Sequence, residues 1–244
     1  MFTRQPEYIK KIASIIGRNS FLKDLLRPLY EGYLRTLTHH RNKLFIKNGV
    51  QVLHNFDKCM TENGFKYTLA FGTMLGAVRE HGFIKHDLDL DVAMWAEDYN
   101  ESIKECLKKY GFKLRHELLV DNGTTGREET YELNGVSIDI FYIYPALDRY
   151  PYCCDFISVQ GTVSFIDSMK KFGYIRPRRI QLPWGKKYIR IPFENLKLPI
   201  PENAHEILSF RYGKDYMTPN PNWHYTDANK YTTEWEGKKG IMKK

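Results

Sequence analysis

The sequence has few cysteines, and none stands in the spacing of a structural metal site. Its 244 residues contain four of them. They are Cys59, Cys106, Cys153 and Cys154. No Cys-x-x-Cys pair and no partner histidine cluster accompanies them, which argues against a zinc ribbon or finger. This usage is typical of a reducing compartment, so we expect reduced thiols and a cytoplasmic protein.

Long apolar runs and internal repeats are also absent. No segment reaches the roughly 20 apolar residues that a membrane-spanning helix needs. Residues 1–18 lack the apolar core of a signal peptide, so we expect no cleaved leader. The absence of a recurring period excludes repeat architectures. With 42% hydrophobic and 14% aromatic residues, the chain can still bury one sizeable core.

The charge is strongly one-sided. Lysine and arginine exceed the acids, giving a net charge of +8 and an isoelectric point near 9.1. An excess of this size favours acidic partners such as nucleotides, phosphate-bearing glycans, anionic lipid or nucleic acid. A solvated basic surface explains it equally well, and both interpretations stay open.

Residues 6–62 predict helices with apolar residues at helical spacing and basic residues between them. Pro28 predicts a break or a first turn. We favour packing of these helices on the core, and contact with the inner face of a membrane is the alternative. The predicted organisation is therefore a helical extension over 1–62 and a catalytic domain over 63–244.

The remaining chain mixes strands and helices. Strands are predicted at 65–71, 88–95, 112–120 and 129–145, the last with a hairpin turn at Asn134-Gly135. Helices are predicted at 74–82, 97–111 and 202–213. Residues 150–200 show no strong period, and the segment after Gly213 is predicted as loop.

Three aspartates stand at alternate positions around the strand "LDLDVAMW". Because side chains alternate between the faces of a strand, Leu88, Leu90 and Val92 point one way while Asp89 and Asp91 point the other. Neighbouring carboxylates repel each other, and a divalent cation relieves that repulsion. Carboxylate oxygens suit Mg²⁺, with Mn²⁺ as an alternative. The alternation therefore predicts a strand that carries metal ligands.

A third carboxylate is expected from a neighbouring strand. Asp139 is the lone acid in the apolar run "VSIDIFYIY". A buried acid needs a partner, so Asp139 either completes the metal site or pairs with an arginine. We favour the metal site, with Asp139 as a further catalytic residue.

A glycine turn precedes the acid strand and predicts an anion-binding site. Gly72 and Thr73 open a helix, where backbone N–H groups and a hydroxyl face an anion. Arg79 lies seven residues later, on about the same helix face as Gly72. Lys85 and His86 lead directly into the acids. We predict these five residues as substrate-binding.

In combination, these residues resemble a known family. The segment "FGTMLGAVREHGFIKHDLDLDVAM" is similar to the signature of LicD/fukutin-type proteins of the nucleotidyltransferase-fold superfamily. The segment "IPFENLKLPIPENAHEILSFRYGKDYMTPNP" is similar to the C-terminal region of that family, where a short helix ends in Tyr-Gly. The resemblance covers about residues 50–225. Leu88 interrupts a run of acids that is common in the family, which leaves Asp87 as an outer-shell group.

The resemblance implies an α+β fold with a small mixed β-sheet flanked by helices. It implies metal-dependent transfer of a phosphoryl-alcohol group, phosphocholine or polyol phosphate, from a CDP-linked donor with release of CMP. Acceptors are typically hydroxyls of cell-surface glycans or teichoic-acid-like polymers. By this comparison, Asp89, Asp91 and Asp139 hold Mg²⁺, and Gly72 and Thr73 position the donor phosphates.

Other functions stay open at this point. The same fold also transfers the nucleotidyl group itself to a small molecule, a protein or RNA. A calcium loop fits Asp87, Asp89 and Asp91 but has Val92 where glycine is needed. A sugar-nucleotide glycosyltransferase would need a βαβ unit ahead of the acids, where this sequence predicts helices instead. A non-enzymatic basic scaffold binding membrane or nucleic acid needs no metal, and the sequence holds no recognised nucleic-acid module.

Overall fold

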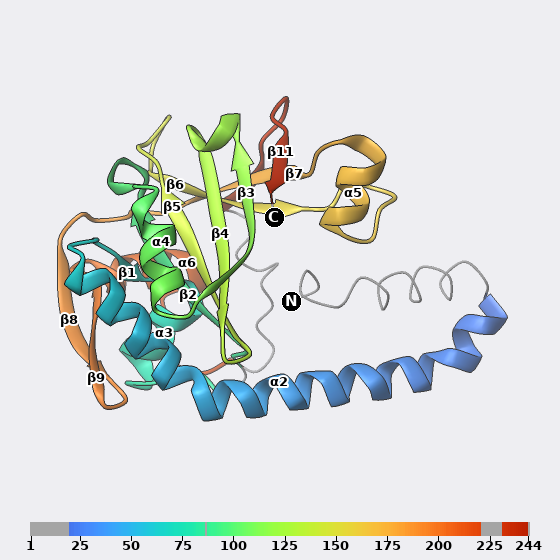
Figure 1. Cartoon of the computed structure of the whole chain (residues 1–244), viewed down its shortest axis with the longest axis horizontal. Coiled ribbons are helices and arrows are strands. Elements are labelled where there is room, and N and C mark those ends of the chain that lie inside the picture. Colours follow the sequence, from blue (N-terminus) through green and yellow to red (C-terminus); the bar gives the residue numbers. More distant parts are fainter. Residues whose placement is uncertain (1–19, 86, 221–230, 244) are drawn as a thin grey trace.

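A computed structural model describes residues 20–85, 87–220 and 231–243 of the chain. Helices and strands alternate along it, which confirms the predicted α+β class (Figure 1). The α-helices are α2 (Ser20–Glu62), α3 (Phe71–Arg79), α4 (Ser102–Lys109), α5 (Phe165–Phe172) and α6 (Ala204–Tyr212).

The main sheet has six strands in the order β1-β2-β5-β4-β3-β11. They are β1 (Thr68–Leu69), β2 (Asp89–Trp95), β3 (Lys113–Val120), β4 (Gly126–Leu133), β5 (Val136–Ile143) and β11 (Gly240–Lys243). The strands β2 and β5 run parallel, and the other neighbours are antiparallel. The predicted small mixed sheet is thus confirmed.

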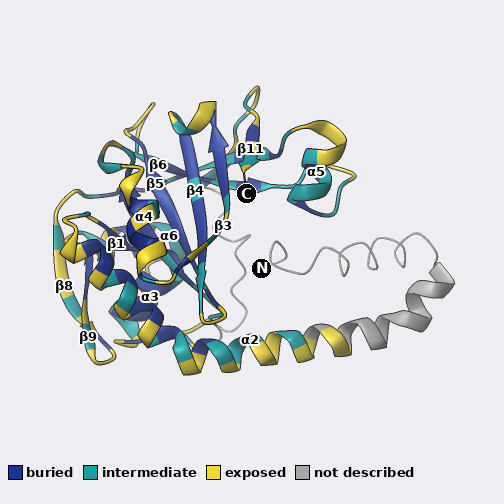
Figure 2. Cartoon of the chain, in the orientation of Figure 1, coloured by how far each residue is buried: buried dark blue, intermediate teal, exposed yellow. Residues whose placement is uncertain are grey.

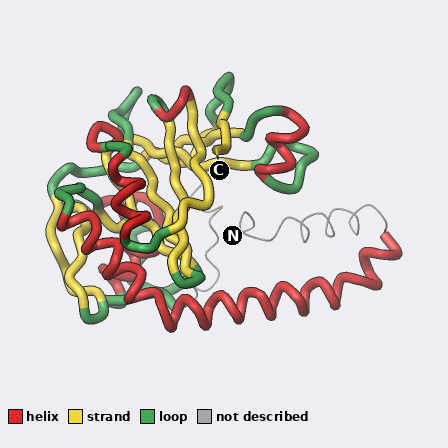
Figure 3. The backbone as a smooth tube through the Cα atoms, viewed as in Figure 1, coloured by secondary structure: helices red, strands yellow, loops and turns green. Residues whose placement is uncertain are grey.

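Two smaller sheets occupy the region that showed no period in the sequence (Figure 3). One contains β6 (Tyr152–Ile157), β7 (Arg176–Gln181) and β10 (Thr232–Glu234), and the other contains β8 (Tyr188–Phe193) and β9 (Leu196–Pro201). The prediction of a loop after Gly213 was wrong, because β11 adds to the edge of the main sheet beside β3. A four-residue edge strand pairs through its backbone and leaves little side-chain pattern.

The helix α2 is continuous through Pro28, where a break or a first turn was predicted. A proline removes one backbone hydrogen bond, and a helix of 43 residues keeps the turns on both sides. From Phe45 onward α2 buries a stripe that includes Leu53 and Phe56, so this part packs on the core as favoured. The stretch from Arg35 to His40 is largely exposed (Figure 2). The domain boundary after residue 62 stays a prediction.

The acids and the apolar residues of the central strands point to opposite faces of the main sheet at the start of β2. Leu90, Val92 and Ile140 are fully buried on one face, and α2 and α4 lie in front of that sheet while α6 lies behind it (Figure 1). The aspartates of β2 alternate with these apolar residues and therefore point to the other face. The acid face also carries core residues, among them Ala93 and Phe141, so the aspartates lie at the edge of a hydrophobic core that covers both faces of the sheet.

The hairpin between β4 and β5 sets the register of the site. Asn134 and Gly135 form its two-residue connection with φ values of 51° and 78°. Positive φ at both positions is the geometry that Asn-Gly favours, so the predicted turn is confirmed. This turn fixes Thr130 opposite Asp139.

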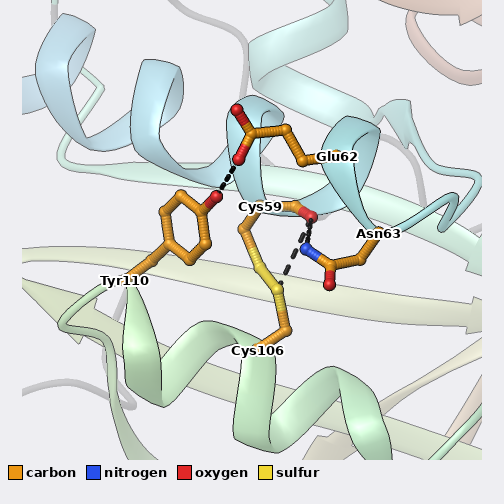
Figure 4. Close-up of a disulfide and its surroundings, with 5 residues drawn as sticks. All are labelled: Cys59, Glu62, Asn63, Cys106 and Tyr110. Atoms are coloured by element: carbon orange, nitrogen blue, oxygen red, sulfur yellow. Dashed lines mark hydrogen bonds between the residues drawn. A yellow bond between two sulfur atoms is a disulfide. The ribbon is translucent and has the colours of Figure 1, made fainter.

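The cysteines depart from the expectation of reduced thiols. Cys59 of α2 and Cys106 of α4 form a disulfide, while Cys153 and Cys154 are free and buried (Figure 4). The two bonded residues lie 47 positions apart, on helices that pack together, so their spacing in the sequence carries no signal. Asn63 donates to the Cys59 carbonyl at 2.9 Å beside this bond. Disulfides persist mainly in oxidising environments, so the cytoplasmic location stays a prediction.

Candidate active site

Three predicted aspartates share one face of two parallel strands. Asp89 and Asp91 are two positions apart on β2, so their side chains point to the same side. Asp139 of β5 is the direct register partner of Asp91, and Ser137 is the partner of Asp89. Register partners on adjacent strands lie on the same face of the sheet. The structure therefore places the three carboxylates on one face of the sheet, and their role as a shared site stays a prediction.

The carboxylate of Asp139 is buried and oriented by a neighbouring strand. Its exposed fraction is 7%, and Thr130 Oγ1 donates a hydrogen bond to its Oδ1 at 2.8 Å. The same hydroxyl oxygen lies 3.2 Å from His116 Nε2. A chain from His116 through Thr130 thus fixes one oxygen of Asp139.

The glycine turn is joined directly to the acid strand. Ala70 N–H donates to the Asp91 carbonyl at 3.0 Å, and Asp91 N–H donates to Thr73 Oγ1 at 2.9 Å. Gly72 and Thr73 lie within the first turn of α3, whereas the sequence predicted a strand through Phe71. Phe71 has φ of 42°, a strained value for a bulky residue, and this sharp bend explains the early start of the helix.

Gly72 lies against two carboxylates. A Cβ at this position would lie 3.6 Å from Asp87 Oδ1 and 3.7 Å from Asp91 Oδ2. Both acids therefore face the open side of one glycine, where a ligand atom can approach the backbone closely. Asp87 belongs to the site more directly than its predicted outer-shell role indicated.

Asp87 is the acid with the most perturbed environment. Its Oδ2 is buried and has no hydrogen-bond partner among the residues that the structure describes. Burial and, to a lesser extent, the charge of Asp89 raise the pKa of Asp87 to about 7, and Arg79 opposes the rise. An unpaired carboxylate oxygen beside a second acid favours a cation at this position.

The three basic residues predicted to bind substrate differ in what the structure shows of them. Arg79 lies close enough to Asp87 to act on its pKa, but its Nε donates to Glu80 at 2.7 Å and its Nη1 to the Tyr216 carbonyl at 3.2 Å. Lys85 is exposed, and its carbonyl accepts from an asparagine of α2 at 3.4 Å. His86 lies outside the described residues. The substrate-binding roles of all three stay predictions.

Two residues at the end of α6 were not among the predicted site residues. The Arg211 guanidinium carbon lies 4.6 Å from the centre of the Phe71 ring. Burial raises the pKa of Tyr212 to about 12, and the charges of Asp91 and Asp87 contribute to this rise. The available signal was the Tyr-Gly end of the helix at 202–213, which the sequence shows without indicating where it packs.

The donor set can be tested against the predicted metal. Within the described ranges, no three side chains of His, Cys, Asp or Glu form a group that could hold a metal ion. Asp89, Asp91 and Asp139 nevertheless share one face, and Asp87 brings a buried oxygen without a partner among the described residues. Carboxylate oxygens of this kind fit a hard divalent cation that keeps some of its waters. By its chemistry this donor set suits Mg²⁺ or Mn²⁺, and the metal itself stays a prediction.

The described part of the chain contains no helix that combines the length and apolar character of a membrane span.

Comparison with known proteins connects this site to characterised sequences. Residues 64–203 match the family model described as LicD/FKTN/FKRP, nucleotidyltransferase domain. The chain is 26% identical over 191 residues to a Mus musculus protein named ribitol-5-phosphate transferase FKTN, which covers 76% of this chain. Its identity to the Homo sapiens protein of that name is 25% over 187 residues, which is 74% of this chain.

A third relative has no assigned activity. It is an uncharacterised Caenorhabditis elegans protein, 33% identical over 139 residues, which is 51% of this chain and 35% of that protein. The chain spans 36% of the length of each of the two FKTN proteins. The matched segment includes the glycine turn and all three aspartates of the shared face.

Proposed function

We propose, since this chain belongs to the LicD/FKTN/FKRP nucleotidyltransferase-domain family, that it is a metal-dependent transferase of phosphoryl-alcohol groups. The group is phosphocholine or a polyol phosphate, the donor is CDP-linked, and the acceptor is a hydroxyl of a cell-surface glycan or related polymer. The observation that supports this proposal is the placement of Asp89, Asp91 and Asp139 on one face of the sheet, with Asp91 beside the glycine turn. The names of the FKTN relatives support transfer of this kind.

The three aspartates would hold the divalent cation. When bound, such a cation stabilises negative charge on the phosphoryl oxygens of the donor. Asp139, held by Thr130, is the carboxylate that we assign to accept the proton of the attacking hydroxyl. Gly72 leaves room for the donor phosphates beside Asp91, and Thr73 fixes the Asp91 backbone.

The reaction is tested by incubating the chain with CDP-choline, CDP-ribitol and CDP-glycerol in the presence of Mg²⁺. The acceptors are a panel of glycans and polyol-phosphate polymers. Chromatography should show CMP released from one donor, and EDTA should stop the release. If every donor stays intact with every acceptor, the proposal is wrong. The product mass separates it from nucleotidyl transfer, in which the nucleotide stays on the acceptor.

The metal site is tested by thermal unfolding, which requires no substrate. We expect Mg²⁺ or Mn²⁺ to raise the unfolding temperature, because a ligand that binds only the folded chain stabilises it. Asp87→Asn should raise the stability of the chain in EDTA by about 1 kcal/mol, because it removes a crowded and unpaired buried carboxylate. The rise in unfolding temperature that Mg²⁺ produces should be smaller in this variant.

The matched control is Asp148→Asn, which changes an exposed acid on the connection between β5 and β6. It should leave both the stability in EDTA and the Mg²⁺ increment unchanged. If Mg²⁺ does not raise the unfolding temperature of the wild-type chain, that result counts against the metal site. A loss of stability in Asp87→Asn would show that Asp87 has a stabilising partner.

A further inference from the structure

Arg211 lies where α6 meets the glycine turn. It belongs to the last turn of α6, and its guanidinium stacks over Phe71, the first residue of α3. The Phe71 ring in turn meets Phe141 at 4.8 Å and Trp184 at 5.9 Å, both edge to face. Phe141 is two positions after Asp139 on β5 and shares its face. The guanidinium is therefore held by aromatic rings at the edge of the acidic site.

The ring contacts of Arg211 do not provide acceptors for its N–H groups. Its Nε and Nη1 are both buried, and neither has a partner within the described part of the chain. Other buried or half-buried arginines are satisfied: Arg127 donates to Glu117 and Glu129, and Arg178 to Asp155. Arg179 leaves only its Nε without such a partner. A buried charged donor without an acceptor is costly, so a ligand that supplies the acceptor is favoured.

The contact with Phe71 places Arg211 beside the acids, because Phe71 directly precedes Gly72, which lies against the Asp87 and Asp91 carboxylates. The neighbouring Tyr212 is affected by the charges of Arg211, Asp91 and Asp87. A hydrogen bond with Arg211 lowers the pKa of Tyr212, while the two acids raise it. Two N–H donors without a partner among the described residues therefore lie near acids that a cation can bridge. A phosphate oxyanion has the matching charge and geometry for a guanidinium fork.

We propose that Arg211 binds a phosphate oxyanion at the candidate active site, with Phe71 holding its guanidinium in place. The predicted cation for this role, Arg79, already donates to Glu80 and to the Tyr216 carbonyl. Arg211 has the two free directions that Arg79 lacks among the described residues. The identity of the phosphate, on the donor or on an anionic acceptor, rests on the proposed function, whereas the anion site does not.

The anion site is tested by calorimetric titration of the full chain with inorganic pyrophosphate in the presence of Mg²⁺. Arg211→Gln should weaken binding by about 10- to 100-fold, the range of one or two charge-assisted hydrogen bonds. Arg211→Lys should weaken it less, because it keeps the charge and loses the fork. Arg115→Gln, at an exposed arginine paired with Glu132, should bind as the wild type does.

In this titration, two results overturn the proposal. One is the absence of saturable pyrophosphate binding by the wild-type chain, and the other is binding by Arg211→Gln within twofold of the wild type. Should the Arg211 variants fail to fold, the unmutated chain still decides. Phenylglyoxal modification of arginines is then mapped by mass spectrometry. Pyrophosphate should slow modification of Arg211 and not of Arg115, and equal rates at Arg211 with and without pyrophosphate overturn the site.

Steady-state kinetics identify the source of the phosphate. If the donor supplies it, Arg211→Gln raises KM for the CDP-linked donor. If the acceptor supplies it, KM for the acceptor rises instead. Either result supports the anion site, whereas kinetics unchanged from the wild type overturn it. A chain that releases no CMP but binds pyrophosphate through Arg211 refutes the proposed reaction and keeps the anion site.

Discussion

Asp91→Asn is expected to lower CMP release by about 10³-fold, the scale on which enzymes lose rate when a preorganised electrostatic group is removed. Asp91 connects the acid strand to both the neighbouring strand β5 and the glycine turn. It is the register partner of Asp139, it faces Gly72, and its peptide group is fixed by Ala70 and Thr73. Asparagine keeps the shape and these backbone bonds, and it removes the charge. The loss should therefore appear in kcat with the fold intact.

The unfolding free energy separates this result from simple destabilisation. We expect Asp91→Asn to unfold within about 1 kcal/mol of the wild type in EDTA, because the variant removes one of several neighbouring like charges. The Mg²⁺-dependent rise in unfolding temperature should disappear with the activity. The exposed-acid variant Asp148→Asn serves as the matched control for both measurements. Full CMP release by a folded Asp91→Asn protein would show that the acid strand does not carry the chemistry.

Local patterns in the sequence were sufficient to predict the strands and the turn that carry the candidate site. The alternation of aspartates and apolar residues in β2 predicted both the strand and its two faces, because a half-buried strand has a period of two. Asn134-Gly135 predicted the hairpin, because few other residue pairs accept two positive φ values. Asp139 was predicted as the third acid because an isolated acid in an apolar strand needs a partner.

The features that the sequence analysis missed depend on contacts between distant segments. β11 is recognisable only by its pairing with β3, 120 or more positions earlier. The disulfide joins Cys59 to Cys106 through the packing of α2 against α4. Arg211 belongs to a short helix whose own pattern does not reveal that it meets Phe71. Local periodicity carries no information about such contacts, since it reports only which face of an element is buried.

The two glycines of α3 should respond to alanine in opposite ways. Gly76 is buried, and a Cβ there would lie 2.4 Å from the Gly82 carbonyl oxygen and 3.3 Å from the Ile84 backbone nitrogen. These are backbone atoms, so relief requires movement of the segment that leads into Asp87 and β2. We expect Gly76→Ala to lower the free energy of unfolding by about 2–4 kcal/mol, the range of a forced overpacking. Urea titration followed by circular dichroism measures this loss.

Gly72→Ala provides the comparison, because its Cβ meets only the Asp87 and Asp91 oxygens, at ordinary contact distances of 3.6–3.7 Å. Alanine is also the better helix former by about 1 kcal/mol, so the variant should be as stable as the wild type. The new methyl group nevertheless fills the space in front of two carboxylates, and CMP release should fall by about 10- to 100-fold, the cost of a misplaced substrate. A stable and fully active Gly72→Ala would place the donor elsewhere, whereas a stable Gly76→Ala would mean that the segment from Gly82 to Ile84 yields freely.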